Sequence, residues 1–349
     1  MTAHDTLTPG RPKEFYQSLP KVELHRHLEG SLRLETMVEV ARQQGMRIQG
    51  TSQLRSLVQV NDGEPYNFRN FLSKFDTLRT FHQSPEIIGR FAREVVADAA
   101  ADNVRYLELR FTPVALSAAQ GFPLADVFDW VIENVETASQ KNGIWTSLIV
   151  SLNRHESVKI AEQIAGLAVD RMGRGVAGLD LAGNESQFSA LPFTGVIREA
   201  KQAGLHITIH AGEWGVAQNV SEAILHLSAE RIGHGVRVME DPAAVELSRV
   251  QGIPFCVCVT SNVQSGVAAS LEDHPIRAML EAGLNVTLNT DDPSICQICL
   301  SDEYRKFCED LGFSLETLRE RLLSAARAAF LPEPERQVLI KRLLEEFPV

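Results

Sequence analysis

Residues 253–259, IPFCVCV, form a nearly continuous apolar run of strand length. A run that lacks the polar alternation of a half-exposed strand is typical of a strand buried on both faces. Seven similar β-rich runs occur in the chain, so the full set is VELH from Val22, VRYLELRF from Val104, IWTSLIV from Ile144, VAGLDLA from Val176, LHITIH from Leu205, RIGHG from Arg231, IPFCVCV from Ile253 and LNVTLN from Leu284. Eight such strands predict an α/β fold, a (β/α)8 or TIM barrel with additional helices.

Segments with helical spacing of apolar residues separate these runs, as a parallel sheet requires. They are Leu34–Arg42, Ile87–Ala101, Leu124–Ala138, Val158–Met172, Val196–Ala203 and Ala223–Leu227. Two parts fall outside the repeat, a long insertion at 50–81 and a helical tail at 302–349, and residues 1–18 are expected to be peripheral. The chain has no Gly/Ser-rich linker or internal repeat. A single domain covering 1–349 is therefore expected.

Composition narrows the class of protein. The 349 residues are 44% hydrophobic and 23% charged, as in soluble globular domains. The net charge is −11 and no stretch is strongly basic, which argues against a nucleic-acid partner and suits a small-molecule ligand better. No segment resembles a signal peptide or a membrane span. We therefore expect a cytoplasmic protein without a membrane partner.

The five cysteines are odd in number and scattered, which argues against a disulfide framework. Cys296 and Cys299 form a CxxC pair, but no second pair accompanies it. Two free thiols near a junction between a loop and a helix are the favoured interpretation, and half of a metal site is the alternative.

Titratable residues gather where several predicted strands end, at the end of a barrel where active sites are built. They are His25 and His27 after the first run, His210 and Glu213 after the fifth, His234 after the sixth, and Asp291 and Asp292 after the eighth. Because residues two apart in a strand face the same side, His25 and His27 can both point to the barrel mouth. Four histidines with carboxylates at one end predict a zinc site.

Each residue also has a plainer interpretation. Glu213 could be a salt-bridged loop residue, but its place just beyond His210 suits a proton donor beside a metal-activated water. The adjacent charges of Asp291 and Asp292 could belong to an Asp-Asp-Pro turn, or be offset by a metal and a ligand hydrogen bond. Gly183 could serve a turn or allow the backbone to approach a ligand closely. The convergence of the set on one barrel end favours the functional interpretation.

Seven motifs, in order from about Leu19 to Leu344, resemble those of the adenosine deaminase family. They are PKVELHRHLEGSL from Pro20, YLELRFTP from Tyr106, GLDLAGNE from Gly178, HAGEWG from His210, ERIGHGV from Glu230, TSNVQSG from Thr260 and LNTDDPSI from Leu288. The resemblance implies a zinc-dependent hydrolytic deaminase of purine metabolism. It also implies one zinc per chain, with the ligands His25, His27, His210 and Asp291.

The resemblance implies further roles, residue by residue. Glu213 matches the residue that protonates the purine N1, and His234 matches the one that orients and helps deprotonate the attacking water. Asp292 matches the partner of N7, and Gly183 matches the backbone donor to N3. His27 and Asp291 would also lie against the substrate and the reacting water. Phe71, Leu72 and Phe75, in FLSKFDTL, resemble a helical lid over the substrate.

One motif departs from the nucleoside pattern. Adenosine-specific members usually carry HLDG where this chain has HLEG, so Glu29 replaces an aspartate that is thought to hold the ribose 5′-hydroxyl. Adenosine or 2′-deoxyadenosine, converted to inosine or 2′-deoxyinosine and ammonia, is the expected substrate because YLELRFTP resembles the nucleoside branch. The alternatives are adenine and a 5′-modified adenosine such as aminodeoxyfutalosine.

Other classes of protein fit the residues less well. The second zinc deaminase architecture has a His-x-Glu motif followed by Pro-Cys-x-x-Cys, and no Pro-Cys-x-x-Cys occurs in this sequence. Two-metal amidohydrolases often use a bridging lysine, which does not follow the fourth run. A purine-binding protein without activity would be expected to have lost Glu213 or a metal ligand.

Overall fold

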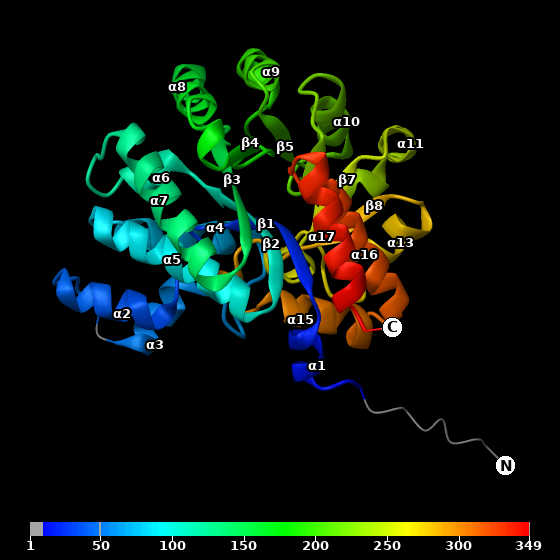
Figure 1. The fold of residues 1–349 in the computed structure, drawn as a ribbon, viewed down its shortest axis with the longest axis horizontal. Coiled ribbons are helices and arrows are strands. Elements are labelled where there is room, and N and C mark those ends of the chain that lie inside the picture. The colour runs from blue at the N-terminus through cyan, green and yellow to red at the C-terminus, as the bar shows by residue number, and fades with distance from the viewer. Residues whose placement is uncertain (1–9, 49, 349) are drawn as a thin grey trace.

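The computed structural model describes residues 10–48 and 50–348, and its centre is one sheet of eight parallel strands in the order β1 to β8 (Figure 1). The strands are Lys21–His27 (β1), Val104–Phe111 (β2), Trp145–Asn153 (β3), Val176–Ala182 (β4), His206–Ala211 (β5), Arg231–His234 (β6), Pro254–Val257 (β7) and Asn285–Leu288 (β8). All eight predicted strands are present, and the sheet curls into a (β/α)8 barrel with a helical shell. The fold prediction is confirmed.

The barrel closes between β1 and the residues just beyond β8. The Asp291 N–H donates to the His25 carbonyl at 2.9 Å, and the His27 N–H donates to the Asp291 carbonyl at 2.8 Å. A side chain continues the seam, because the Leu24 N–H donates to Asn289 Oδ1 at 2.8 Å. Closure therefore fixes the backbone of His25, His27 and Asp291 relative to one another.

Helices on the outside cover the strands. The crossover helices are Leu34–Gln43 (α2), Pro85–Ala101 (α5), Leu124–Asn142 (α7), Val158–Val169 (α8), Thr194–Gln202 (α9), Ala217–Leu225 (α10), Pro242–Gln251 (α11) and Ile276–Glu281 (α13). Short helices at strand ends and turns are Pro113–Ser117 (α6), Met172–Arg174 (η2), Leu191–Phe193 (η3), Val236–Glu240 (η4), Val259–Gln264 (α12) and Pro293–Cys296 (α14). The sequence patterns did not indicate α11, whose buried face is made of the small residues Ala244 and Ser248.

The predicted insertion forms three helices, Thr51–Val58 (α3), Phe68–Leu78 (α4) and Arg79–Phe81 (η1). The Asn67 side chain caps α4 by accepting from the Asn70 N–H at 2.9 Å. Phe71 and Leu78 on α4 are buried in a second apolar cluster with residues of α2, α5 and α14. That packing holds the exposed edge of α4 over the mouth of the barrel.

The two ends of the chain cover the opposite part of the barrel. The elements are Lys13–Ser18 (α1), Leu300–Arg305 (α15), Lys306–Asp310 (η5), Leu315–Ala328 (α16) and Glu333–Glu346 (α17), so the helical tail begins at Leu300. Buried Arg231, at the start of β6, pairs with Glu108 and donates to the Ala328 carbonyl at 2.9 Å. The tail is thereby joined to the amino-terminal end of the strands, away from the strand ends that carry the histidines.

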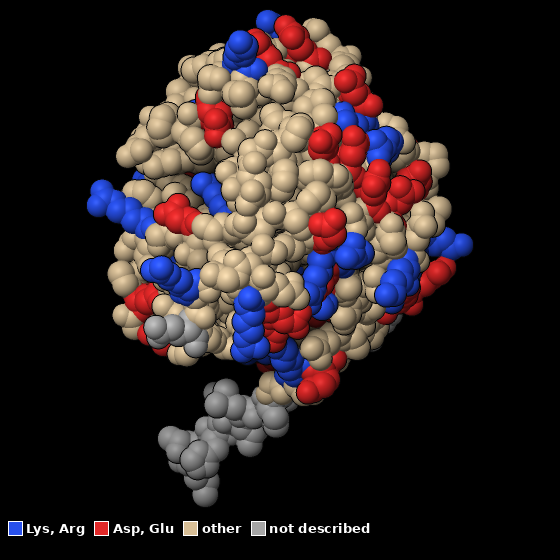
Figure 2. Space-filling view, turned by 90° about the vertical axis from the view of Figure 1, so that its left-hand side faces the viewer, with Lys and Arg blue, Asp and Glu red and all other residues tan. Residues whose placement is uncertain are grey.

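The described surface carries charges of both signs. On the face shown in Figure 2, lysine and arginine side chains of the described residues are interspersed with aspartates and glutamates, and they do not form one basic field. No helix among the described residues is long and apolar enough to cross a bilayer.

Candidate active site

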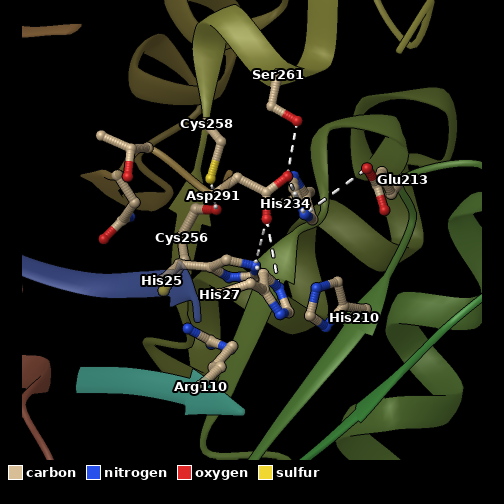
Figure 3. Close-up of polar contacts among 12 residues, drawn as sticks. His25, His27, Arg110, His210, Glu213, His234, Cys256, Cys258, Ser261 and Asp291 are labelled. Carbon is tan, nitrogen blue, oxygen red and sulfur yellow. Dashed lines mark hydrogen bonds and ion pairs between the residues drawn. The ribbon is translucent and has the colours of Figure 1, made fainter. Parts of the chain in front are cut away.

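The predicted histidine and carboxylate cluster comes together at the carboxyl ends of the strands (Figure 3). His25 Nε2 lies 3.3 Å from His27 Nε2 and 3.2 Å from Asp291 Oδ1. The centre of the His25 ring lies 4.6 Å from that of His210 and 4.8 Å from that of His234, and the centres of the His210 and His234 rings are 5.3 Å apart. Four rings and one carboxylate, contributed by β1, β5, β6 and the segment after β8, therefore surround one point.

This cluster fits a divalent metal ion. One donor atom from each of His25, His210, His234 and Asp291 can be chosen so that all lie within 4.8 Å of one another. Burial, opposed by Asp291, lowers the pKa of His27 to about 3, and burial holds the pKa of His25 well below its usual value. Neutral imidazoles with their nitrogens together, beside one carboxylate, form a donor set that zinc prefers.

A glycine makes room for two of these rings. A Cβ at Gly233, on β6, would lie 2.8 Å from Cε1 of His25 and 3.3 Å from Cγ of His210. Any larger residue would push the rings out of the cluster, so the sequence Ile-Gly-His in β6 serves the packing of the site.

Further buried residues orient the cluster. Asp180 Oδ1 lies 3.0 Å from His210 Nδ1, so the other ring nitrogen is directed to the centre, and the Arg110 Nε–H donates to Asp180 Oδ2 at 3.3 Å. Burial raises the pKa of Asp180, but the neighbouring His210 and Arg110 outweigh it and hold the pKa below its usual value. Ser261 donates to Asp291 Oδ2 at 2.7 Å. Such outer partners fix a ligand's tautomer and direction.

Two of the site residues have an unusual backbone. His234 has φ of 57° and Asp291 has φ of 67°, both in the left-handed region. A residue other than glycine costs about 1–3 kcal/mol there, and such residues cluster at functional sites. The rest of the barrel therefore stabilises a conformation that the two residues would not adopt by themselves.

Glu213 lies beside the cluster as a buried acid. Burial, and then the charge of Asp291, raises the pKa of Glu213 well above its usual value. Its Oε1 lies 3.7 Å from His234 Nε2. Glu185 holds the loop by accepting from the N–H groups of Gly212 at 2.9 Å and Trp214 at 2.7 Å. The arrangement directs a buried carboxyl group, whose protonated form is favoured, toward anything bound in front of the cluster.

A cavity opens in front of these residues. The predicted residues His27, Glu29, Phe71, Leu72, Phe75, Gly183, His210, Glu213, His234, Asp291 and Asp292 all line it, together with Asp76, Arg79, Thr112, Ala115, Asn153, His155, Ala182, Asn184 and Trp214. His25 lies behind this wall, fully buried. The structure thus brings every residue of the predicted site to one cavity or directly behind it.

Asp292 and Glu29 depend on close packing within that wall. A Cβ at Gly30 would lie 1.7 Å from Asp292 Oδ1, so only glycine leaves space for this carboxylate. Burial, and then Asp291, raises the pKa of Asp292 well above its usual value. Glu29 Oε1 accepts from the Thr112 N–H at 2.6 Å. Both acids are fixed in place.

Sequence reasoning did not single out the supporting residues Asp180, Glu185, Ser261, Asn262 and His274. Asp180 had a usable signal, because it is an acid inside an apolar strand. His274 is buried and hydrogen-bonded to Asn262, which in turn contacts His234. Its sequence neighbours give no indication of that link. The five cysteines are free, as expected.

Comparison with known proteins agrees with this geometry. The family model described as adenosine deaminase matches residues 20–346. An adenosine deaminase of Erwinia tasmaniensis is 36% identical over 329 residues, which cover 93% of this chain and 98% of that relative.

Solved structures share the whole fold. An adenine deaminase from Arthrobacter aurescens superposes with a TM-score of 0.87 at 28% identity and covers 94% of this chain and 98% of its own. An amidohydrolase from Burkholderia ambifaria with bound zinc superposes with a TM-score of 0.89 at 27% identity, covering 99% of this chain and 95% of its own. This chain is thus similar along nearly its full length to deaminases that differ in substrate.

The contact between Asp180 and His210 yields a test of the cluster. Asp180→Asn keeps the shape but removes the negative charge that fixes His210, so zinc affinity should fall by about 10- to 100-fold. Competition with a chromogenic chelator measures this change. Asp129→Asn, at a surface ion pair with Arg171, is the control. Equal affinity of Asp180→Asn and the control would contradict the orienting role.

Proposed function

The chain belongs to the adenosine deaminase family and is a hydrolytic deaminase, and from this premise we propose that its substrate is a purine nucleoside, adenosine or 2′-deoxyadenosine. Water replaces the 6-amino group, so the products are inosine or 2′-deoxyinosine and one ammonia. The observation that carries the proposal is the buried carboxyl group of Glu213, 3.7 Å from His234 and beside the His and Asp cluster within one cavity, where burial and the charge of Asp291 raise its pKa. An acid that can protonate a ring nitrogen thereby faces the place where water is activated.

We further propose that one zinc ion binds His25, His27, His210 and Asp291. The Nε2 atoms of His25 and His27 lie 3.3 Å apart and 3.2 and 3.4 Å from Asp291 Oδ1. His210 has a ring nitrogen within 4.8 Å of a donor atom of each of these histidines. When bound, zinc supplies the Lewis acidity that makes water a nucleophile at neutral pH. The protein's own residues then bind the purine, orient the water and move protons.

Three purine nitrogens have a partner in the cavity wall. Glu213 donates its proton to N1, which makes C6 more electrophilic. Asp292, whose Oδ1 has no hydrogen-bond partner among the described residues, donates to N7. The backbone N–H of Gly183, at a positive φ of 94°, donates to N3. These three contacts fix C6 over the cluster, and correct positioning is itself a large part of catalysis.

The helices of the insertion cover the cavity. Phe71, Leu72 and Phe75 on α4 line it opposite the cluster. Apolar side chains there exclude bulk water, so the bound purine meets only the water that the site orients. His234 Nε2, which lies between Glu213 and Asp291 at 3.7 and 3.8 Å, orients that water.

Glu29 is the proposed partner of the ribose 5′-hydroxyl. Its Oε1 accepts from the Thr112 N–H, so Oε2 is the oxygen that would bind the hydroxyl.

A 5′-modified adenosine is a second candidate because of Arg79. This arginine lines the cavity, and its Nε has no hydrogen-bond partner among the described residues. An anionic group on C5′ would give it a partner.

Metal analysis tests the zinc proposal. Protein purified without added metal should contain one zinc per chain by elemental analysis. His210→Ala should lose that zinc, whereas His206→Ala, at the other end of β5 and paired with Glu230, should keep it. Two tightly held metals per chain, or full activity without metal, would contradict the proposal.

The proton donor is tested by Glu213→Gln, which keeps size and polarity. We expect kcat to fall by about 10²- to 10⁴-fold, the range typical of general acid catalysis, with zinc retained. The surface change Glu246→Gln, at an exposed pair with Arg249, is the control and should leave kcat unchanged. Near-normal turnover of Glu213→Gln with zinc bound would exclude Glu213 as the donor.

The substrate is tested by kcat/KM for adenosine, adenine and adenosine 5′-carboxylate. If Glu29 binds the 5′-hydroxyl, Glu29→Ala should reduce the value for adenosine by roughly tenfold, since the hydrogen bond to a buried carboxyl group is lost, and affect adenine far less. Preference of the wild type for adenine would defeat the nucleoside proposal. Preference for the 5′-carboxylate, abolished by Arg79→Met, would establish the second candidate.

A further inference from the structure

A buried chain of hydrogen bonds leads away from the active site behind His234. His234 Nδ1 lies 3.1 Å from Asn262 Nδ2, and Asn262 Oδ1 lies 3.2 Å from His274 Nε2. Asn262 belongs to α12, and His274 lies in the turn before α13. The exposed fractions of the three residues are 1%, 0% and 4%, so bulk water does not compete for these bonds. His274 takes no part in the cavity wall.

The hydrogen bond that His274 makes with the backbone shows which of its ring nitrogens carries the proton. The backbone N–H of Ile276 donates to His274 Nδ1 at 3.1 Å. A backbone N–H can only donate, so His274 Nδ1 is an acceptor and carries no proton. The single proton of this neutral ring is therefore on Nε2, and the Nε2–H donates to Asn262 Oδ1.

This direction determines the orientation of the Asn262 amide. Its oxygen accepts from His274, so its NH₂ group faces His234 and donates to Nδ1. The flipped amide would place an NH₂ group against the His274 Nε2–H, and two donors would then face each other. His234 Nδ1 is consequently an acceptor, and the ring's proton is on Nε2.

His234 Nε2 is the nitrogen on the side of the reaction, near Glu213 Oε1 and Asp291 Oδ2. We infer that Asn262 and His274 are positioning residues that hold His234 as its Nε2–H tautomer, so that His234 donates a hydrogen bond to the attacking oxygen and is not its base. The inference deepens the proposed function and rests on it for the identity of the reaction.

The proton of the water then needs another acceptor, and Asp291 is the adjacent carboxylate. The water transfers a proton to Asp291, its oxygen bonds to C6, and Glu213 protonates N1. When the C6–N bond breaks, the proton on Asp291 goes to the departing amine, which leaves as ammonia. The new hydroxyl returns its proton to Glu213 as it becomes the 6-oxo group. His234 keeps its proton throughout and stabilises the charge on oxygen.

The tautomer can be observed directly by ¹⁵N NMR of the zinc-loaded enzyme labelled in its histidines. The His234 signals, assigned by their loss in His234→Gln, should show a protonated Nε2 and an unprotonated Nδ1. An unprotonated Nε2 would overturn the inference. The spectrum does not require turnover, so it decides the tautomer even if no purine is deaminated and the proposed function fails.

Asn262→Asp tests whether the hydrogen bonds from Asn262 and His274 determine the tautomer of His234. The carboxylate can still accept from His274, but it offers only acceptors to His234, so Nδ1 must take a proton. We expect that proton in the spectrum and a kcat lower by roughly 10²-fold or more, with KM for adenosine within about threefold, as for other wrong histidine tautomers. The inference would be overturned if His234 Nδ1 stays unprotonated in Asn262→Asp. It would also be overturned if the proton moves from Nε2 to Nδ1 and kcat is unchanged.

A control variant and a variant of His274 complete the experiment. Asn142→Asp makes the same substitution at the end of α7, where the side chain donates to the Ala138 carbonyl, and it should leave the His234 signals and kcat unchanged. His274→Phe removes the residue that orients the amide, so both tautomers of His234 should appear together. A single Nε2–H tautomer in His274→Phe would show that His274 has no orienting role.

Discussion

Two backbone hydrogen bonds of Asp291 hold the site together. They close the barrel between β1 and the residues after β8, and they join Asp291 to the backbone of His25 and His27. Because the same three residues carry donor atoms of the cluster, closing the sheet and assembling the cluster are one event. The left-handed φ of Asp291 turns its side chain toward the histidines while its backbone stays in the seam.

The charge of Asp291 affects the protonation of the acids around it. Asp291 is paired with histidines and Ser261, so it stays ionised, and its charge together with burial favours the neutral forms of Glu213 and Asp292. One carboxylate can then accept a proton while two neighbouring acids can donate one. Environments that push the pKa values of neighbouring acids apart in this way divide the roles among them. Gly30 and Gly233 provide the space that so dense a set of side chains needs.

The sequence predicts the parts that depend on local patterns. Apolar runs such as IPFCVCV identify all eight strands, and strand ends place His25, His210 and Asp291 together. Contacts between side chains from distant segments cannot be predicted from such local patterns. Asp180 meets His210 from the neighbouring strand, and His274 reaches His234 only through Asn262, so neither role follows from flanking residues. The α11 helix was missed because a face of small residues has little apolar signal.

Amide hydrogen exchange of the metal-free protein tests most directly whether closure of the barrel builds the site. The N–H groups of Asp291 and His27 should be as strongly protected as those inside β4 and β5, because the seam belongs to the barrel and its bonds do not depend on the metal. Rapid exchange of these two amides, with the other strands still protected, would contradict the account. It would mean that the barrel is open at the seam until a metal draws His25, His27 and Asp291 together.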